Sequence, residues 1–136
     1  MLKINDLKVG ESKEFQIVID EKSHEEFENI TKDNSPVHND EKTARKAGFE
    51  NKILYGFHVV SHISRLYGAL ITEGSSVCVS QSIKFVKPLY LNEKINIKGI
   101  ITHINQELKS VTVKNEIRNS KDEICITGEG ILKLFI

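Results

Sequence analysis

The stretch that decides the fold is FHVVSHISRLYGALI, residues 57–71, which carries apolar side chains on nearly every side of a predicted helix. A helix of this kind is buried over most of its surface. After Gly74 the apolar period changes from about 3.6 residues to about 2, the period of β-strands. The alternating apolar residues of these strands are Val77, Val79, Ile83, Phe85, Ile95, Ile97, Ile101, Val111, Val113, Ile124, Ile126, Leu132, Leu134 and Ile136.

This order of elements predicts the fold class. Turns at residues 88–93, 105–108 and 119–123 are short enough for an antiparallel meander. One long apolar helix followed by four long strands indicates an α+β fold in which the sheet wraps around the central helix, as in a hotdog fold. Such a sheet has exposed edges and a face too large for one helix, so we expect a paired homodimer.

The segment before the helix carries shorter elements. Residues 14–20 predict a further strand, and Ser23 with Glu26 forms a capping box that predicts a helix start. Asp40 is predicted to cap a short helix that ends at Gly48, a residue suited to the left-handed conformation.

Whole-chain composition predicts a single domain over residues 1–136 and excludes several classes of function. Basic and acidic residues number 19 each, so the zero net charge leaves no electrostatic footprint for nucleic acid or an anionic membrane. No apolar run is long enough to span a bilayer, and residues 1–6 contain no signal-peptide core, so we expect a cytoplasmic protein. Cys78 and Cys125 lie in predicted strands and lack a metal-type spacing, so we expect buried, reduced thiols and no cofactor.

Residues 33–38, DNSPVH, carry the chemistry, because they place Asp33 and His38 on a short, proline-bent loop. An acid and a base this close can manage one water molecule, as hydration of a carbon–carbon double bond requires. General acid–base chemistry of this kind contributes about 10²–10⁴ in rate. The same run is also a common helix start, with Ser35 as cap and Pro36 in the first position, and alone it favours that interpretation.

Two other histidines could be read as metal ligands. His58 and His62 are four residues apart on the predicted helix, a spacing that can share a metal ion. No third ligand is evident, and the glutamate that a zinc protease places after the first histidine is missing. We therefore interpret them as helix-surface or core histidines and expect no metal site.

Beyond the loop, the chain resembles the MaoC-like (R)-specific enoyl-CoA hydratases, also called hydratase 2, over residues from about 27 to 134. Lys32 stands where this family usually has glycine, Ser35 where asparagine is usual, and Tyr55 where histidine is frequent. Residues 49–56, 80–89 and 128–130 resemble further family segments. The family signature is matched here by Phe27, Ile30, Thr31, Asp33, Asn34, Pro36, Val37, His38 and Ala44.

The resemblance implies reversible hydration of a trans-2-enoyl-CoA to the (3R)-3-hydroxyacyl-CoA, with Asp33 and His38 holding the water between them. Backbone N–H groups at the start of the central helix, around Gly56, are suited to stabilise the enolate oxygen. Ser61 falls where the family carries a serine bonded to the catalytic aspartate, so it is expected to orient Asp33. For Gly56 and Ser61 the alternatives are a plain helix entry and an ordinary helix serine.

The expected substrate contacts come from both the loop and the helix entry. The acyl-thioester is expected to touch Ser35, Pro36, Tyr55 and Phe57, and the bulk of Tyr55 and Phe57 indicates a short acyl chain. The phosphates of coenzyme A or of a carrier-protein arm could meet two lysines, although solvated strand lysines are the simpler interpretation. These two are Lys84 and Lys87.

Several alternatives stay open at this point. The acyl group could be carried by acyl-carrier protein, which makes the chain a (3R)-hydroxyacyl-carrier-protein dehydratase. A hotdog thioesterase and a non-catalytic acyl-thioester-binding module are the other two, and both fit the Asp33 and His38 pair less well. The expected partners are the thioester substrate and further copies of the chain, as a homodimer or a dimer of dimers.

Overall fold

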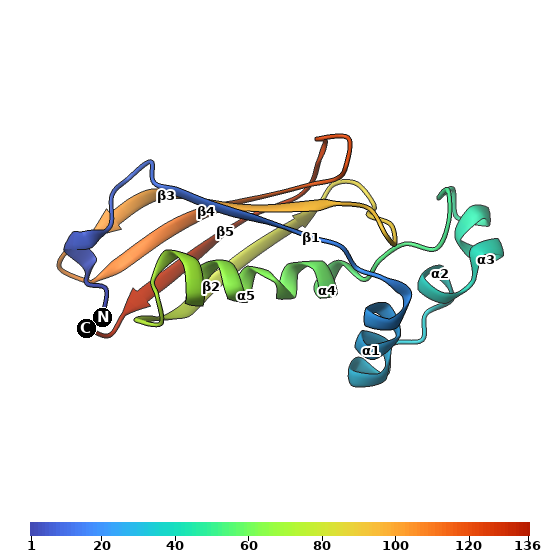
Figure 1. Ribbon diagram of the computed structural model, residues 1–136, viewed down its shortest axis with the longest axis horizontal. Helices are drawn as coiled ribbons and strands as arrows, with labels where there is room; N and C mark the ends of the chain where they lie inside the picture. Colours follow the sequence, from blue (N-terminus) through green and yellow to red (C-terminus); the bar gives the residue numbers. More distant parts are fainter.

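Five antiparallel strands form one sheet in the computed structural model, which describes residues 1–136 (Figure 1). The strand order is β1-β3-β4-β5-β2, with β1 and β2 at the edges. The predicted four-strand meander is confirmed for β3-β4-β5 but wrong for its first connection, because residues 88–93 do not join neighbouring strands and β2 pairs with β5 instead of β3. The predicted strand at residues 14–20 begins and ends earlier, as β1. The strands are β1 (Ser12–Ile17), β2 (Ser76–Phe85), β3 (Ile95–Asn105), β4 (Ser110–Arg118) and β5 (Ile124–Leu134).

The predicted central helix lies along one face of this sheet (Figure 1). It runs as α4 (Gly56–Ser61), α5 (Ile63–Arg65) and a π-helical segment, η2 (Leu66–Ile71). The main core joins the helix to the inward face of β3, β4 and β5. An antiparallel sheet packed on a central helix confirms the expected α+β class.

Leu66 occupies the centre of this packing, and its truncation gives a stability prediction. Its side chain is fully buried, and a Cβ added at Gly99 of β3 would lie 2.8 Å from Leu66 Cδ2. We expect Leu66→Ala to lower the free energy of unfolding by about 2–5 kcal/mol, because the tight site leaves a cavity. The matched control is Leu108→Ala: Leu108 is 57% exposed, so we expect a change within about 0.5 kcal/mol. Chemical denaturation followed by circular dichroism measures both, and equal losses would contradict this placement.

Three short helices extend beyond the end of the sheet that lies opposite the two termini (Figure 1). They are α1 (Glu21–Thr31), α2 (Pro36–Asn39) and α3 (Glu41–Lys46). The predicted capping box at Ser23 is wrong, because Asp20 caps α1 one turn earlier and accepts a 2.9 Å hydrogen bond from Ser23 N. The cap of α3 is confirmed, since the Asp40 carboxylate accepts from Thr43 N at 3.1 Å. Gly48, at φ +96°, follows the end of α3.

Strand β2 differs from the other long strands because most of its apolar side chains remain exposed, although Ile83 packs against the core. The expected burial of the thiols is wrong for Cys78, which is exposed on this strand, and confirmed for Cys125. Val77, Val79 and Phe85 are 55%, 59% and 50% exposed. The predicted alternation correctly identified a strand, which carries a bulge between Cys78 and Ser80. Within one chain, however, this edge strand presents apolar surface to solvent. No helix of the molecule is both long enough and apolar enough to cross a bilayer.

Candidate active site

The loop between α1 and α2 is shaped by backbone geometry at both of its ends. Helix α1 ends at Lys32, which adopts the left-handed conformation at φ 63°. Glycine adopts this conformation without strain, which gives a physical reason for glycine being usual here in the resembled family. At the other end, Pro36 occupies the first turn of α2, where its missing N–H costs nothing. Asp33 therefore sits on a short segment between two defined helix ends.

The Asp33 carboxylate is held by Ser35 through one of its two oxygens. Asp33 Oδ1 accepts hydrogen bonds from the backbone N–H of Ser35 at 3.0 Å and from its hydroxyl. The alternative interpretation of this run as a helix start holds for the backbone, with Ser35 at the N-cap position of α2 and Pro36 in its first turn, but the Ser35 hydroxyl bonds Asp33 and makes no cap bond to α2. These two bonds, with a smaller contribution from the nearby His38, hold the pKa of Asp33 below its ordinary value. Asp33 Oδ2 makes no hydrogen bond within the chain and is free to meet a water.

The His38 ring is oriented by a backbone carbonyl. Its Nδ1–H donates to the carbonyl oxygen of Ile53 at 2.9 Å, and the ring stacks on Tyr55 with centroids 4.1 Å apart. Because a carbonyl only accepts, Nδ1 carries a proton and Nε2 is left for chemistry. Asp33 and His38 thus each have one anchored atom and one free atom.

Removal of the Ser35 hydroxyl is expected to move the pH dependence of any reaction that needs ionised Asp33. In Ser35→Ala the largest cause of the lowered pKa is lost, so that pKa rises toward its ordinary value. Ionised Asp33 is then lost at a higher pH, and the acid limb of the kcat/KM profile shifts upward. Ser35→Thr keeps the hydroxyl and serves as the control. An unshifted acid limb in Ser35→Ala would contradict this account.

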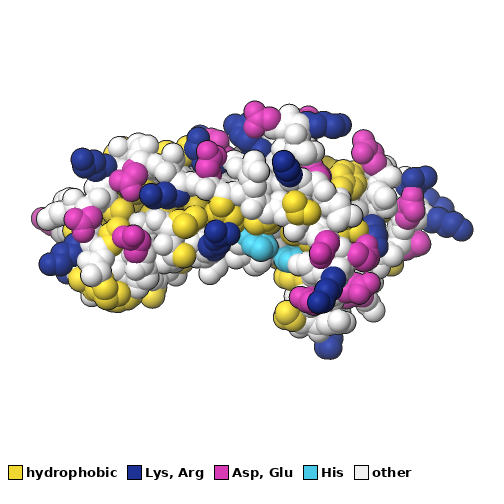
Figure 2. Space-filling view, in the orientation of Figure 1, with side chains coloured by type: hydrophobic (Ala, Val, Ile, Leu, Met, Phe, Trp, Pro, Cys, Tyr) yellow, Lys and Arg dark blue, Asp and Glu magenta, His cyan; other side chains and the backbone are white.

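A cavity of about 580 Å³ brings the predicted pair together with the helix entry. Eleven of its 17 lining residues are hydrophobic, which suits an acyl chain. In the space-filling view, histidine side chains (cyan) appear where the sheet-and-helix body meets the helical end of the molecule (Figure 2). Of the residues that the sequence singled out, the cavity is lined by Asp33, His38, Tyr55, Gly56, Phe57 and Lys87.

The entry of the central helix offers unused donors to this cavity. The backbone N–H groups of Gly56 and Phe57 donate to no acceptor in the chain, and no side chain caps the helix. A Cβ added at Gly56 would lie 2.3 Å from Cε1 of the Phe85 ring. Glycine therefore allows a close approach to the backbone here. Phe57 is 70% exposed and packs edge-on to Phe85, with ring centroids 5.6 Å apart.

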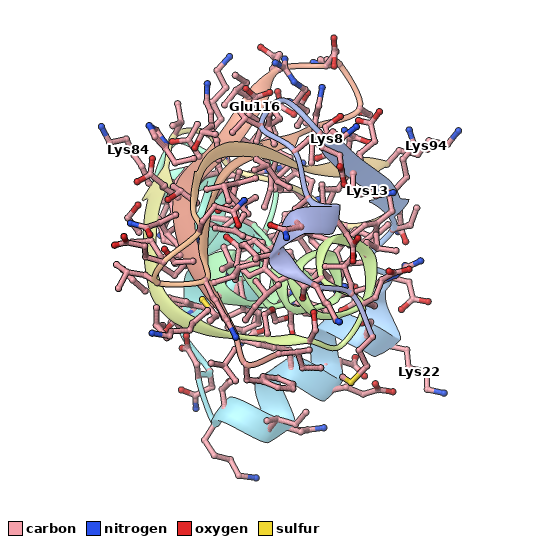
Figure 3. All side chains as sticks on the ribbon, turned by 90° about the vertical axis from the view of Figure 1, so that its left-hand side faces the viewer. Lys8, Lys13, Lys22, Lys84, Lys94 and Glu116 are labelled. Carbon is pink, nitrogen blue, oxygen red and sulfur yellow. The ribbon has the colours of Figure 1, made fainter.

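Five predicted contacts take a different place in the structure. Ser35 is absent from the cavity wall, and its hydroxyl donates to Asp33 Oδ1. Ser61 is not brought to Asp33, because its hydroxyl donates to the carbonyl of His58 at 2.6 Å within the same helix. Lys84 points outward from β2 into solvent and does not line the cavity (Figure 3). Lys87 does line it, but its ammonium is paired with Glu123 at 2.6 Å. Pro36 lies at the start of α2 and is absent from the cavity wall.

His58 is confirmed as a core histidine. Its ring is 8% exposed and stacks on Phe27, with centroids 4.7 Å apart. Burial, with smaller contributions from His62 and His24, lowers the pKa of His58 to about 4. The ring is therefore neutral at pH 7 and contributes to packing behind the cavity.

One residue near the site carried no recognisable sequence signal. His24 is 1% exposed on α1, and its Nε2–H donates to the backbone carbonyl of His38 at 2.9 Å. A lone histidine in an otherwise polar helix segment gives no indication that it turns inward. Only the packing of α1 on the loop reveals this contact.

Comparisons with known proteins identify relatives of this chain. The (R)-specific enoyl-CoA hydratase of Aeromonas caviae is 25% identical over 108 residues, which cover 79% of this chain and 81% of that protein. The mitochondrial 3-hydroxyacyl-[acyl-carrier-protein] dehydratase of Arabidopsis thaliana is 35% identical over 89 residues, 65% of this chain. Those residues cover only 52% of the Arabidopsis protein, so the match spans about half of its length.

Solved structures and a family model complete the comparison. The structure of the (R)-hydratase from A. caviae involved in PHA biosynthesis matches with a TM-score of 0.89 at 23% identity, covering 94% of this chain and 97% of that one. This likeness confirms the expected hotdog fold. The family model described as "MaoC like domain" matches residues 5–125, which include residues 33–38 and all the cavity-lining residues except Ile126. The chain therefore belongs to the MaoC-like domain family.

Proposed function

We propose that this protein catalyses the reversible, (R)-specific hydration of a trans-2-enoyl-CoA to the (3R)-3-hydroxyacyl-CoA. One observation carries the proposal: Asp33 and His38 line one largely apolar cavity, each with one atom anchored and one free. Relatives named as (R)-specific enoyl-CoA hydratase and 3-hydroxyacyl-[acyl-carrier-protein] dehydratase support hydratase or dehydratase chemistry.

Hydration begins with the thioester carbonyl at the helix entry. The free N–H groups of Gly56 and Phe57 would donate to the carbonyl oxygen as it gains enolate charge, helped by the positive end of the helix. A water held between Asp33 Oδ2 and His38 Nε2 attacks C3. Asp33 takes a proton from this water, and His38 delivers the proton on Nε2 to C2.

The proton balance closes without another reactant. The reaction starts with ionised Asp33 and protonated His38, and it leaves a protonated carboxyl group and a neutral ring. Transfer of one proton between the two restores the starting state. Because both groups act from one side of the double bond, the addition is syn and gives one configuration at C3. Dehydration follows the same steps in reverse.

A second candidate function is dehydration of a (3R)-hydroxyacyl group on acyl-carrier protein. The name of the Arabidopsis relative favours it, and the match to that protein is the more identical of the two. Lys87 stands at the cavity but is paired with Glu123, so it offers little free charge to coenzyme A phosphates. A thioesterase or a binding module has no comparable support.

Short acyl chains are the proposed substrates. Phe27 and Phe49 line the cavity, and the Phe57 and Phe85 rings meet beside Gly56. These four rings limit the space into which an acyl chain can extend from the helix entry. A series of enoyl-CoA substrates of increasing length tests this directly, because kcat/KM should fall as the chain lengthens.

A homodimer is the proposed assembly. The unpaired edge of β2 exposes Val77 and Val79, and an antiparallel partner would cover both while extending the sheet. Light scattering on the protein as it elutes from a size-exclusion column measures its molecular mass in solution. A monomer at micromolar concentration would contradict the proposal.

The deciding experiment mixes purified protein with crotonyl-CoA and follows the ultraviolet absorbance of the conjugated thioester. We expect this absorbance to fall, and chiral analysis of the product to give the (3R) isomer. Release of free thiol would indicate a thioesterase instead. No fall, together with saturable acyl-CoA binding, would point to a carrier-protein substrate or a binding module, and crotonyl-carrier protein then separates these two.

A further inference from the structure

A buried histidine outside the cavity wall holds the catalytic loop from behind. His24 is 1% exposed and does not line the cavity, so it cannot touch the substrate. The only hydrogen bond of its ring runs from Nε2–H to the carbonyl of His38, while its Nδ1 has no partner. Burying a polar ring costs free energy unless its polar atoms are hydrogen-bonded. The single hydrogen bond of the ring therefore explains why a polar residue occupies this position.

The carbonyl that His24 binds needs a partner from elsewhere in the chain. Helix α2 has only four residues, so the carbonyl of His38 lies in its last turn and accepts no hydrogen bond from another residue of α2. The same residue is held through its side chain, because His38 Nδ1–H donates to Ile53 O. The backbone and the ring of His38 are therefore fixed by two separate elements.

Tyr55 makes the matching contact at the start of the loop. It is 2% exposed, and its hydroxyl donates to the backbone carbonyl of Asp33 at 2.5 Å. Its ring stacks on His38 and lies 4.9 Å from the ring of His24, centroid to centroid. The hydroxyl is thus already used, so only the ring of Tyr55 is left for the substrate contact expected from the sequence.

We propose that His24 and Tyr55 form a clamp that positions Asp33 and His38 by holding the backbone carbonyl of each. This inference rests on the proposed hydration for its kinetic consequence, though the clamp itself exists without substrate. Both are positioning residues, because their polar atoms bind the loop. Displacement of a catalytic group by about 1 Å can cost about 10²-fold in rate, so the clamp acts on kcat and leaves KM nearly unchanged.

Three variants separate the hydrogen bonds from the packing. Tyr55→Phe keeps the ring and removes the hydroxyl, and His24→Leu removes the Nε2 donor. His24→Gln places an amide N–H near the position of Nε2 and is the conservative rescue. We expect kcat to fall by about 10- to 100-fold in Tyr55→Phe and His24→Leu. His24→Gln should recover most of the wild-type kcat, and KM should stay within about twofold in all three.

A second readout needs no activity at all. In the wild type, ¹⁵N spectra of labelled histidine should show a proton held on Nδ1 of His38, and the amides of His38 and Asp40 should exchange slowly, because both are hydrogen-bonded. In His24→Leu and Tyr55→Phe we expect faster exchange of these two amides, with the core strands unaffected. If the wild type proves inactive, the hydration proposal fails while the exchange data still test the clamp.

Definite outcomes would overturn the clamp. The clamp is refuted if both His24→Leu and Tyr55→Phe keep the wild-type amide exchange and the wild-type proton on His38 Nδ1. It is also refuted if kcat falls equally in His24→Leu and His24→Gln, which would indicate that only the packing of the ring matters. A large rise in KM for Tyr55→Phe at unchanged kcat would restore the substrate contact. If His24→Leu fails to fold, Tyr55→Phe, which removes a single oxygen atom, decides the matter by itself.

Discussion

Asparagine in place of Asp33 is expected to lower kcat for enoyl-CoA hydration by about 10²–10⁴-fold and to leave the fold intact. The asparagine Oδ1 can still accept from Ser35, so the loop keeps its shape. The amide cannot take a proton from the attacking water, which is the role proposed for the carboxylate. Steady-state rates with crotonyl-CoA measure kcat and KM, and circular dichroism checks the fold.

The chain contains a closely matched control for this substitution. Asp40 is an exposed aspartate whose carboxylate accepts from the N–H and hydroxyl of Thr43, as Asp33 accepts from Ser35. Its pKa is lowered by the same kinds of bond, but it lies outside the cavity. Asp40→Asn should keep wild-type activity because asparagine caps a helix about as well as aspartate. An active Asp33→Asn variant, or equal losses in the two, would refute the role of Asp33.

His38→Asn is expected to reduce kcat by a similar factor, about 10²–10⁴-fold. The asparagine amide lies near the position of Nδ1 and can keep the bond to Ile53 O, while the Nε2 atom is lost. Because His38 is proposed to act at C2, the exchange of the C2 proton of the 3-hydroxyacyl-CoA with deuterated water should stop. Mass spectrometry of the recovered thioester measures this exchange.

His103→Asn is the control for this second substitution. His103 is exposed on β3, and its ring contacts only the neighbouring Thr102 hydroxyl. If Asp33 and His38 act on one water as a unit, the double variant should be about as slow as the slower single variant. Fully multiplicative losses would instead indicate two independent roles.

Features set by short-range periodicity were predicted well. The central helix lies within one residue of the stretch 57–71, and the meander β3-β4-β5 has its turns where polar, asparagine-containing segments interrupt the alternation. Both patterns follow from the geometry of a single element with one buried face. The closeness of Asp33 and His38 could also be predicted from the sequence, because their spacing and the proline between them are local features.

Side-chain contacts between elements were predicted less well. Ser61 occupies a helix position whose hydroxyl can always bond a carbonyl one turn back, and the structure has it do so. Lys84 lies on the exposed face of an edge strand, and the pairing of Lys87 with Glu123 joins residues 36 positions apart. Which of these orientations is adopted depends on packing that no single segment specifies.

The amino-acid sequence by itself determined the α+β architecture, the buried central helix, and the closeness of the acid Asp33 to the base His38, since each depends on neighbouring residues. The expected loop position holds for Asp33 alone, because His38 lies in α2. Only the tertiary structure decided that Ser35 holds Asp33 and that Ile53 orients His38. It also placed His24 and Tyr55 against the two loop carbonyls. The reason is physical: a carbonyl left unpaired at the end of a short helix accepts from whichever donor the packing of distant segments brings within reach.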